Sequence, residues 1–315
     1  MEQHPAAASP GRRRAPRVLA AAVGAAALLL AGCSDDEPAP PATATVEGDP
    51  GSDLRYVALG DSFTAAPGVP ETSTETFCLR SDSNYPALVA DELGVDLVDV
   101  SCSGATTEHM LTAQFWAGQR QPPQLEALTD EADLVTVSVG GNDFDLFGTL
   151  IGTCSELADL ATSPDDAPCR TRMQAGGSDI LLDQARQIRG RVARVVRAAR
   201  ERAPEAELLV VGYPQMVPDT GACSALPLAP GDYDYARAVN LALTRALEGA
   251  AADTDSPYID VWQASEGHDI CAPQPWINGA GLDATAMPFH PYPVEQEAVA
   301  DLVVAEVEGR LLPRP

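Results

Sequence analysis

The sequence predicts an α/β fold, a three-layer α/β/α arrangement in which a five-stranded parallel sheet lies between helices. Two observations predict it. Short, almost continuously apolar and β-branched runs recur along the chain, as in strands buried on both faces, and helical periods fall between them. The flavodoxin-like strand order, 2-1-3-4-5, suits such a doubly wound sheet. The expected strands are residues 56–59, 95–100, 134–139, 208–211 and 258–261.

Three helical segments are expected beside these strands. Residues 85–93 and 294–311 show helical periodicity. The clearest helix begins at about Ser178, as its N-cap, and ends at Ala203, directly before Pro204. Seven arginines cover the polar faces of this helix. They indicate a solvated surface rather than a basic binding patch.

The first 32 residues are typical of an export signal. Four arginines between positions 12 and 17 precede an apolar run, residues 18–31, which as a helix would be about 21 Å long and too short to span a bilayer. The run ends in Leu30–Ala31–Gly32–Cys33, which resembles a bacterial lipobox. That resemblance implies cleavage before Cys33 and lipidation of its thiol. An ordinary signal peptide with a coincidental cysteine, or a short signal-anchor helix, remains the alternative.

The next segment, residues 33–53, is predicted to be a solvated tether. It is rich in proline, alanine, threonine and acidic residues and shows no apolar period. A single domain, residues 54–315, would follow it. The chain has 46 acidic and 20 basic residues, a formal charge of −26, and its basic residues are all arginine. This charge makes nucleic acid an unfavourable partner.

Six further cysteines are an even set in a chain predicted to be exported, which implies disulfides. Arithmetic alone allows fifteen pairings. Metal binding is the other interpretation, but no C-x-x-C or H-x-x-x-H spacing supports it. The six are Cys78, Cys102, Cys154, Cys169, Cys223 and Cys271.

Four short blocks carry residues suited to nucleophilic catalysis. Ser62 follows the first expected strand and can be the nucleophile, and His290 can be its base. The amides of Ser62 and Gly104, with the Asn142 side chain, can supply three donors to an oxyanion. Gly104 and Asn142 follow the second and third strands, so these residues should meet at one edge of the sheet. Singly, Ser62 or Asn142 could be an ordinary turn residue. The blocks are Gly60–Phe63, Ser103–Gly104, Gly140–Asp143 and Pro288–Pro291.

These blocks, in this order, resemble the SGNH (GDSL) hydrolase superfamily, whose name-giving residues would be Ser62, Gly104, Asn142 and His290. The resemblance covers residues 54–315 and is nearest to secreted actinobacterial esterases and lipases. It implies hydrolysis of carboxylic esters through an acyl-serine intermediate, with no metal or cofactor. It also implies that cysteines pair with their neighbours along the chain. The implied disulfides are Cys78–Cys102, Cys154–Cys169 and Cys223–Cys271.

One position departs from the family pattern. Many members have an aspartate three residues before the histidine, and Met287 stands there in this chain. We expect the backbone carbonyl of Met287 to orient the His290 ring, giving a Ser-His dyad like that of some related secreted esterases. Asp283 and Asp260 are the alternative orienting groups. His268 is the less favoured candidate for the base.

Two irregular segments, residues 144–178 and 213–232, follow strand ends on the side of the expected site. Long loops in that position usually shape a pocket. Phe144, Leu146 and Phe147 are candidates for an acyl-chain surface, and simple packing of the domain is the equal alternative.

The predicted protein is therefore an exported ester hydrolase, monomeric by default, that binds a small or lipid ester and touches the membrane only through an anchor at Cys33. A polysaccharide O-acetyl esterase of the same fold is the first alternative function. A non-catalytic binding lipoprotein is the second.

Overall fold

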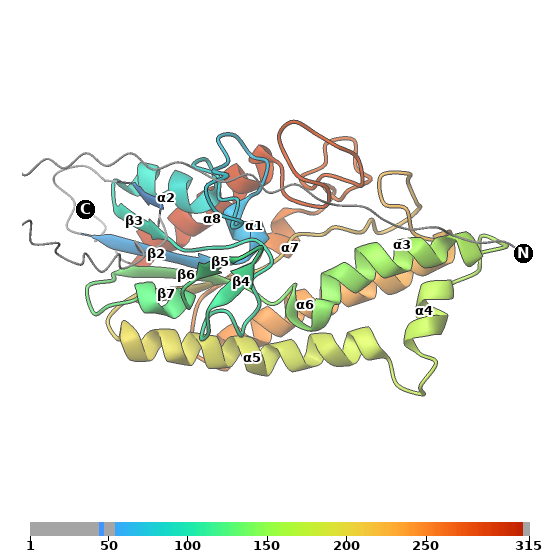
Figure 1. The fold of residues 1–315 in the computed structure, drawn as a ribbon, viewed down its shortest axis with the longest axis horizontal. Coiled ribbons are helices and arrows are strands. Elements are labelled where there is room, and N and C mark those ends of the chain that lie inside the picture. Colours follow the sequence, from blue (N-terminus) through green and yellow to red (C-terminus); the bar gives the residue numbers. More distant parts are fainter. Residues whose placement is uncertain (1–43, 47–53, 311–315) are drawn as a thin grey trace, which may run out of the picture. The chain divides into compact units, whose positions relative to one another are not determined.

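A computed structural model describes residues 44–46 and 54–310, and it contains the predicted parallel sheet (Figure 1). Five parallel strands lie in the order β3-β2-β6-β7-β8, which is the expected 2-1-3-4-5. A short strand, β1, pairs antiparallel with β3 at one edge. The strands are β1 (Ala44–Val46), β2 (Arg55–Gly60), β3 (Asp96–Asp99), β6 (Leu134–Ser138), β7 (Glu207–Val211) and β8 (Tyr258–Ile259).

Both faces of the sheet are buried, which explains why its strands are apolar throughout. Val57 and Val137 belong to a core beneath α5 (Ile180–Arg202) and α6 (Tyr233–Ala252). Tyr56 and Ala58, which alternate with them, belong to a second core beneath α2 (Tyr85–Leu93) and α8 (Pro293–Arg310). Figure 1 shows α2 and α8 above the sheet and α5 and α6 below it.

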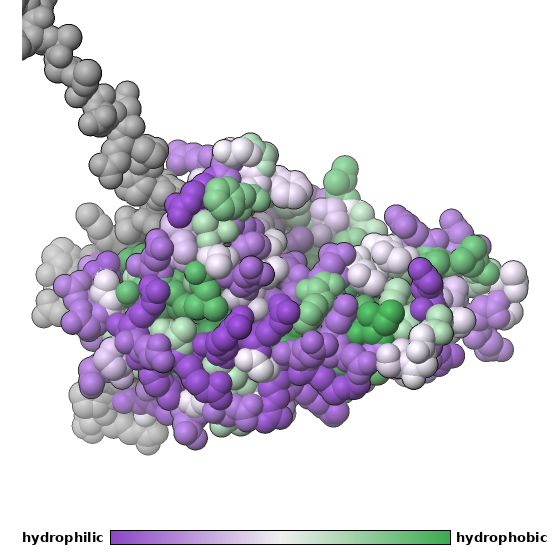
Figure 2. All heavy atoms as spheres, turned by 60° about the horizontal axis from the view of Figure 1, so that its bottom comes forward, coloured by the Kyte–Doolittle hydropathy of each residue, from purple (hydrophilic) through white to green (hydrophobic). Residues whose placement is uncertain are grey.

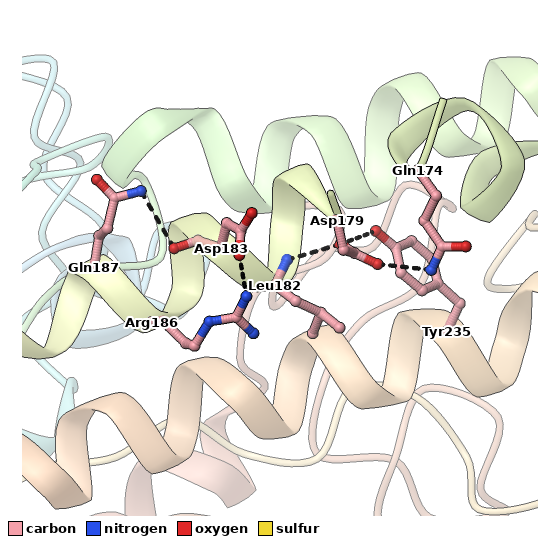
Figure 3. Close-up of polar contacts among 7 residues, drawn as sticks. All are labelled: Gln174, Asp179, Leu182, Asp183, Arg186, Gln187 and Tyr235. Atoms are coloured by element: carbon pink, nitrogen blue, oxygen red, sulfur yellow. Dashed lines mark hydrogen bonds and ion pairs between the residues drawn. The ribbon is translucent and has the colours of Figure 1, made fainter. Parts of the chain in front are cut away.

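Helix α5 matches the predicted helix except at its start. Its N-cap is Asp179 rather than Ser178, because the Asp179 carboxylate accepts a hydrogen bond of 3.0 Å from the Leu182 N–H. Figure 2 turns the face of the molecule that carries α5 forward and shows it mainly hydrophilic, with separate apolar patches. Asp179 also accepts a bond from Tyr235 on α6 (Figure 3). The predicted helices did not include α6.

Two predicted elements differ from the structure. The fifth strand is only two residues long, because Asp260 accepts a bond from the Gln263 N–H and so begins the helix α7 (Val261–Ala264). Part of the predicted tether forms β1, which extends the sheet beyond β3 and is its edge strand. Residues 1–43, 47–53 and 311–315 lie outside the described residues, and so do the predicted signal and Cys33.

The segment expected to be irregular, residues 144–178, consists largely of short helices, which lie beyond one end of the sheet in Figure 1. A small hairpin, which was not expected from the sequence, follows β3. The short helices are η2 (Asp143–Asp145), η3 (Gly148–Thr153), α3 (Cys154–Leu157), η4 (Ala158–Leu160) and α4 (Pro168–Met173), and the hairpin strands are β4 (Gln114–Trp116) and β5 (Gln119–Gln121).

Three disulfides close loops around the sheet, and they join the neighbouring cysteines that the family resemblance implied. Their sequence separations are 24, 15 and 48 residues. Within the part of the chain that the structure describes, no helix is long and apolar enough to cross a membrane. The pairs are Cys78–Cys102, Cys154–Cys169 and Cys223–Cys271.

Candidate active site

Ser62 begins the short helix α1 (Ser62–Ala65) directly after β2, as expected, and its side chain is nearly buried. Asp61 caps this helix by accepting a bond of 2.9 Å from the Phe63 N–H. Gly60 must be glycine, because a Cβ there would lie 2.1 Å from Oγ1 of Thr64. The Gln124 side chain binds both the N–H and the C=O of Gly60 at 2.8 Å, so the turn before the serine is held from both sides.

Gly104 follows β3 and is exposed. Its φ of +72° lies in the left-handed region, which accounts for the glycine. Crowding does not, because a Cβ would meet only the Gln114 side chain at 3.7 Å. The preceding Ser103 donates from its N–H and from its hydroxyl to the carbonyl of Cys78, at 3.1 and 2.7 Å. The Cys78–Cys102 disulfide therefore fixes this turn at its base.

Asn142 follows β6 and lies against the Gly104 turn. Its Nδ2 donates to the carbonyl of Ala105 at 3.0 Å. Its neighbour Asp143, whose side chain is fully buried, accepts bonds from the N–H and the hydroxyl of Thr107 at 2.8 and 2.6 Å. Arg191 on α5 pairs with the same carboxylate at 3.1 Å. The structure therefore brings the second and third blocks together, as the topology predicted.

His290 is held by a backbone carbonyl, but one residue later than predicted. Its Nδ1 lies 2.8 Å from the carbonyl oxygen of Pro288 rather than that of Met287. The reason is a turn in which Phe289 has a φ of +61° and the His290 N–H donates to the Met287 carbonyl at 3.1 Å. The Asn278 amide also donates to that carbonyl, so the Met287 oxygen is engaged elsewhere.

This contact determines which ring nitrogen of His290 is free. Since a carbonyl only accepts, the hydrogen resides on Nδ1 and Nε2 is left as the basic nitrogen. Burial lowers the pKa of His290 below its ordinary value, and the bond to Pro288 opposes this only in part. The ring lies 6.0 Å from the ring of Phe63, centroid to centroid. Among the described residues, no hydrogen bond joins its ring to Ser62.

The other candidate orienting groups have different partners. Asp283 accepts bonds from the N–H and the hydroxyl of Thr285, both at 2.8 Å, and Asp260 caps α7. His268 stacks on Trp276 at 4.7 Å, and its Nδ1 lies 2.8 Å from a backbone carbonyl. These contacts give the three residues local structural roles.

Of the three proposed acyl-chain residues, two belong to the core. Leu146 is fully buried and Phe147 is 7% exposed, so the packing alternative is correct for both. Phe144 is partly buried and lies under the Arg191 guanidinium, 3.9 Å from its carbon to the ring centre. Its φ of +58° accompanies the sharp bend after Asn142.

Tyr213 also lies at this edge, although it was not among the site residues predicted from the sequence. It follows β7, the fourth parallel strand, and its hydroxyl contacts Asp61. Burial raises the pKa of Asp61 to about 7, although the bonds from Tyr213 and Phe63 oppose the shift. The position of Tyr213 after the end of a parallel strand could have indicated it, because Ser62 and Asn142 were selected from the same position on their own strands. Within the described residues, no cluster of three or more histidine, cysteine or acidic side chains could hold a metal ion.

Comparison with known proteins gives consistent matches across the domain. A model of the GDSL-like lipase/acylhydrolase family matches residues 58–294. "Lipase 2" of Streptomyces coelicolor is 36% identical over 292 residues, which cover 90% of this chain and 95% of that protein. An "Esterase" of Streptomyces scabiei is 31% identical over 292 residues, covering 81% of each chain.

Solved structures are similar in fold. A phospholipase A1 from Streptomyces albidoflavus NA297 superposes with a TM-score of 0.65 and 27% identity, covering 81% of this chain and 99% of that one. An extracellular lipase from Streptomyces rimosus gives a TM-score of 0.63 and 26% identity, covering 80% and 98%.

Proposed function

Because this chain belongs to the GDSL-like lipase/acylhydrolase family and is a serine ester hydrolase, we propose that Ser62 is its nucleophile and His290 its general base. The observation that carries this assignment is the 2.8 Å contact between Nδ1 of His290 and the Pro288 carbonyl. It leaves Nε2 unprotonated and free to accept a proton. Burial lowers the pKa of His290, which favours the neutral ring that a general base requires.

In the proposed acylation, Oγ of Ser62 attacks the ester carbonyl carbon while Nε2 of His290 takes the hydroxyl proton. The carbonyl oxygen becomes an oxyanion, which accepts hydrogen bonds from the amides of Ser62 and Gly104 and from Nδ2 of Asn142. The bond from carbon to the alcohol oxygen then breaks, and His290 gives its proton to the leaving alcohol. Water repeats the sequence on the acyl-serine, which releases the acid and restores the enzyme.

The Pro288 carbonyl takes the place of a triad carboxylate in this mechanism. It accepts the Nδ1 hydrogen and holds the ring, but it carries no net charge, so the bond is weaker than a charge-assisted one. The family membership also favours an enzyme over the non-catalytic binding lipoprotein.

Substitution of Ser62 by alanine tests the proposal. Ser62→Ala should lower kcat on p-nitrophenyl butyrate by at least a thousandfold, because no other hydroxyl occupies the nucleophile position. Ser256→Ala is the matched control. Its hydroxyl lies just before β8 and therefore at the amino-terminal edge of the sheet, away from the site. A Ser62→Ala enzyme with a tenth of the wild-type kcat contradicts the assignment.

We further propose that the chain is exported and anchored outside the cell through lipidated Cys33. The support is the basic segment, the short apolar run and the Leu30–Cys33 sequence described above. Labelled palmitate should be incorporated into the wild-type protein, and the protein should be recovered in the membrane fraction. Cys33→Ser should abolish both, and a labelled Cys33→Ser protein would show that the lipid is attached elsewhere.

A further inference from the structure

Tyr213 is a buried polar residue that the catalytic steps above do not use. It lies two residues after β7 and has no exposed surface. Its ring packs edge-on against Phe63, at 5.2 Å between centroids, and against Phe147, at 5.4 Å. The ring therefore sits between the residue that follows Ser62 and the segment that follows Asn142.

The hydroxyl of Tyr213 makes one bond to each of these segments. It donates to Oδ2 of Asp61 at 2.5 Å and accepts from the Gly141 N–H at 2.9 Å. Oδ1 of Asp61 accepts the Phe63 N–H in turn. A continuous chain of hydrogen bonds thus runs from the first turn of α1, through one phenol, to the residue before Asn142.

The directions of these bonds are determined by the chemistry of the groups. An amide N–H can only donate, so the hydroxyl must accept from Gly141 and send its own hydrogen to Asp61. Burial and the neighbouring Asp61 carboxylate raise the pKa of Tyr213 well above its ordinary value, so the phenol keeps that hydrogen. If the Tyr213 hydroxyl were removed, the buried Asp61 carboxylate would lose a donor and the buried Gly141 amide would lose an acceptor.

The connection between the Asn142 block and the Gly104 turn does not involve Tyr213. Asp143 and Asn142 bind the Gly104 turn through Thr107 and Ala105. Two contacts connect the Asp61 turn to the segment that carries Asn142. One is the pair of hydrogen bonds made by the Tyr213 hydroxyl, and the other is the bond of 3.1 Å from the Asp61 N–H to the Ser138 carbonyl. The hydroxyl of Tyr213 therefore makes a side-chain hydrogen-bond link between the segment of the nucleophile and that of Asn142.

We propose that Tyr213 is a positioning residue for the oxyanion hole, whose hydroxyl sets the place of the Ser62 amide relative to the Asn142 side chain. The proposal rests on the function assigned above to Ser62 and Asn142. It makes the fourth strand a contributor to the site, beside the first three. Tyr213 touches no substrate in this role.

Removal of the hydroxyl is the direct test, because Tyr213→Phe keeps the ring and its edge-on contacts. An oxyanion donor that is displaced rather than lost should cost less than the hundred- to thousandfold of a deleted donor. We expect kcat on p-nitrophenyl butyrate to fall about 10- to 100-fold with KM within twofold of wild type. Unchanged kcat, or a rise in KM at constant kcat, overturns the proposal.

Tyr235→Phe is the matched control. Its hydroxyl also donates to an aspartate, Asp179, at 2.8 Å, but this pair joins α5 to α6 (Figure 3). The chemical change is the same in both variants. The control should leave kcat and KM within twofold of wild type, and an equal loss in both variants would mean that the Tyr213 effect is one of general stability.

A phosphonate ester separates this proposal from the proposed nucleophile. A p-nitrophenyl alkylphosphonate should react with Ser62 so that an Oγ–P bond forms, p-nitrophenolate leaves and His290 takes the proton. The adduct places a phosphoryl oxygen in the oxyanion hole. The rate per titrated serine should fall in Tyr213→Phe by the same factor as kcat. If wild-type Ser62 is not labelled, the assignment of Ser62 fails. If it is labelled and the Tyr213→Phe rate per site equals wild type, the positioning role fails.

Asp61→Asn tests the same bond from the other side and serves if Tyr213→Phe yields no folded protein. The asparagine oxygen can still accept the Phe63 N–H, whereas its amide cannot accept the phenol hydrogen. The expected result is again a lower kcat and phosphonylation rate at constant KM. Asp179→Asn is its control, and wild-type rates in Asp61→Asn would overturn the proposal.

Discussion

Two tyrosine–aspartate pairs use the same hydrogen bond in different surroundings. Tyr213 and Asp61 are both buried, and their bond joins segments 152 residues apart. Tyr235 and Asp179 join segments 56 residues apart (Figure 3). Asp179 remains partly exposed. Asp179 also caps α5 and accepts a bond from Gln174 at 2.9 Å.

The difference shows how surroundings set the role of a bond. Water can replace a lost partner at the partly exposed Asp179, so that pair contributes mainly to helix stability. Asp61 is only 1% exposed, and its neighbours are the turns that carry Ser62 and Asn142. Substitutions at the carboxyl edge of the sheet should therefore affect catalysis, whereas those at the amino-terminal end of α5 should affect stability.

The largest effect at the carboxyl edge should come from the base. His290→Ala should lower kcat on p-nitrophenyl butyrate by about a thousand- to ten-thousandfold, because it removes the group that takes the Ser62 proton in the proposed mechanism. His268→Ala, which removes a ring stacked on Trp276, should stay within a few-fold. Steady-state rates of both purified variants check this, and comparable losses in the two would contradict the assignment of the base.

A smaller catalytic loss is expected at Asn142. Asn142→Ala removes one oxyanion donor and should lower kcat about a hundred- to a thousandfold with KM nearly unchanged. It also removes the bond to the Ala105 carbonyl, so circular dichroism must show an intact fold. A large rise in KM at constant kcat would instead mean that Asn142 binds the ground-state ester.

The buried side chain of Glu295 should make the stability of the folded protein depend on pH. Burial raises the pKa of Glu295 to about 8, and its side chain has the Gln296 amide as its hydrogen-bond partner. The folded protein then keeps a proton that the unfolded chain loses above about pH 4.5. Its contribution to the free energy of unfolding is complete below that pH and is lost as the pH rises toward 8.

Urea unfolding with intact disulfides measures this contribution. Glu295 should make the wild-type free energy of unfolding about 1–2 kcal/mol lower at pH 8 than at pH 6.5, since a full proton difference corresponds to about 1.4 kcal/mol per pH unit. Asp61, whose pKa burial raises to about 7, should add a smaller fall over the same range. Glu295→Gln, which resembles the neutral acid, should remove the part of the fall that Glu295 contributes. An unchanged slope in the variant would assign the titration to another group.

Substitution at the amino-terminal end of α5 should change the stability of the protein and leave its activity unchanged. Asp179→Ala removes the helix cap together with the partner of Tyr235, and it should lower the free energy of unfolding by about 1 kcal/mol. Its kcat should equal that of wild type. A loss of activity without a loss of stability would show that the two regions are coupled.

The smallest effects are expected at Asp283 and Asp260, the alternative orienting groups for the His290 ring. Asp283→Asn and Asp260→Asn should each keep kcat within a few-fold of wild type, because the His290 ring contacts the Pro288 carbonyl. A true triad acid would show a loss of about ten-thousandfold on the same change. A thousandfold loss in either variant, with its fold intact, would identify a carboxylate as the orienting group.

Local sequence determined much of this protein. Buried parallel strands must be apolar on both faces, so five runs were recognisable without partners, and their order followed from the doubly wound plan. Ser62, Gly104 and Asn142 could be placed together because parallel strands end at a common edge. The start of α5 at Asp179 instead of Ser178 shows the limit of such patterns, since either residue type can cap a helix.

Tertiary structure decided the contacts that join distant segments. The Pro288 carbonyl faces the His290 ring because Phe289 adopts a left-handed backbone, and nothing in the residue type of phenylalanine announces that conformation. Tyr213 reaches Asp61 across 152 residues. Periodicity reports which face of a strand or helix is buried, but it carries no information on which buried hydroxyl, carboxylate and amide will meet, because those bonds form only when the strands are packed side by side.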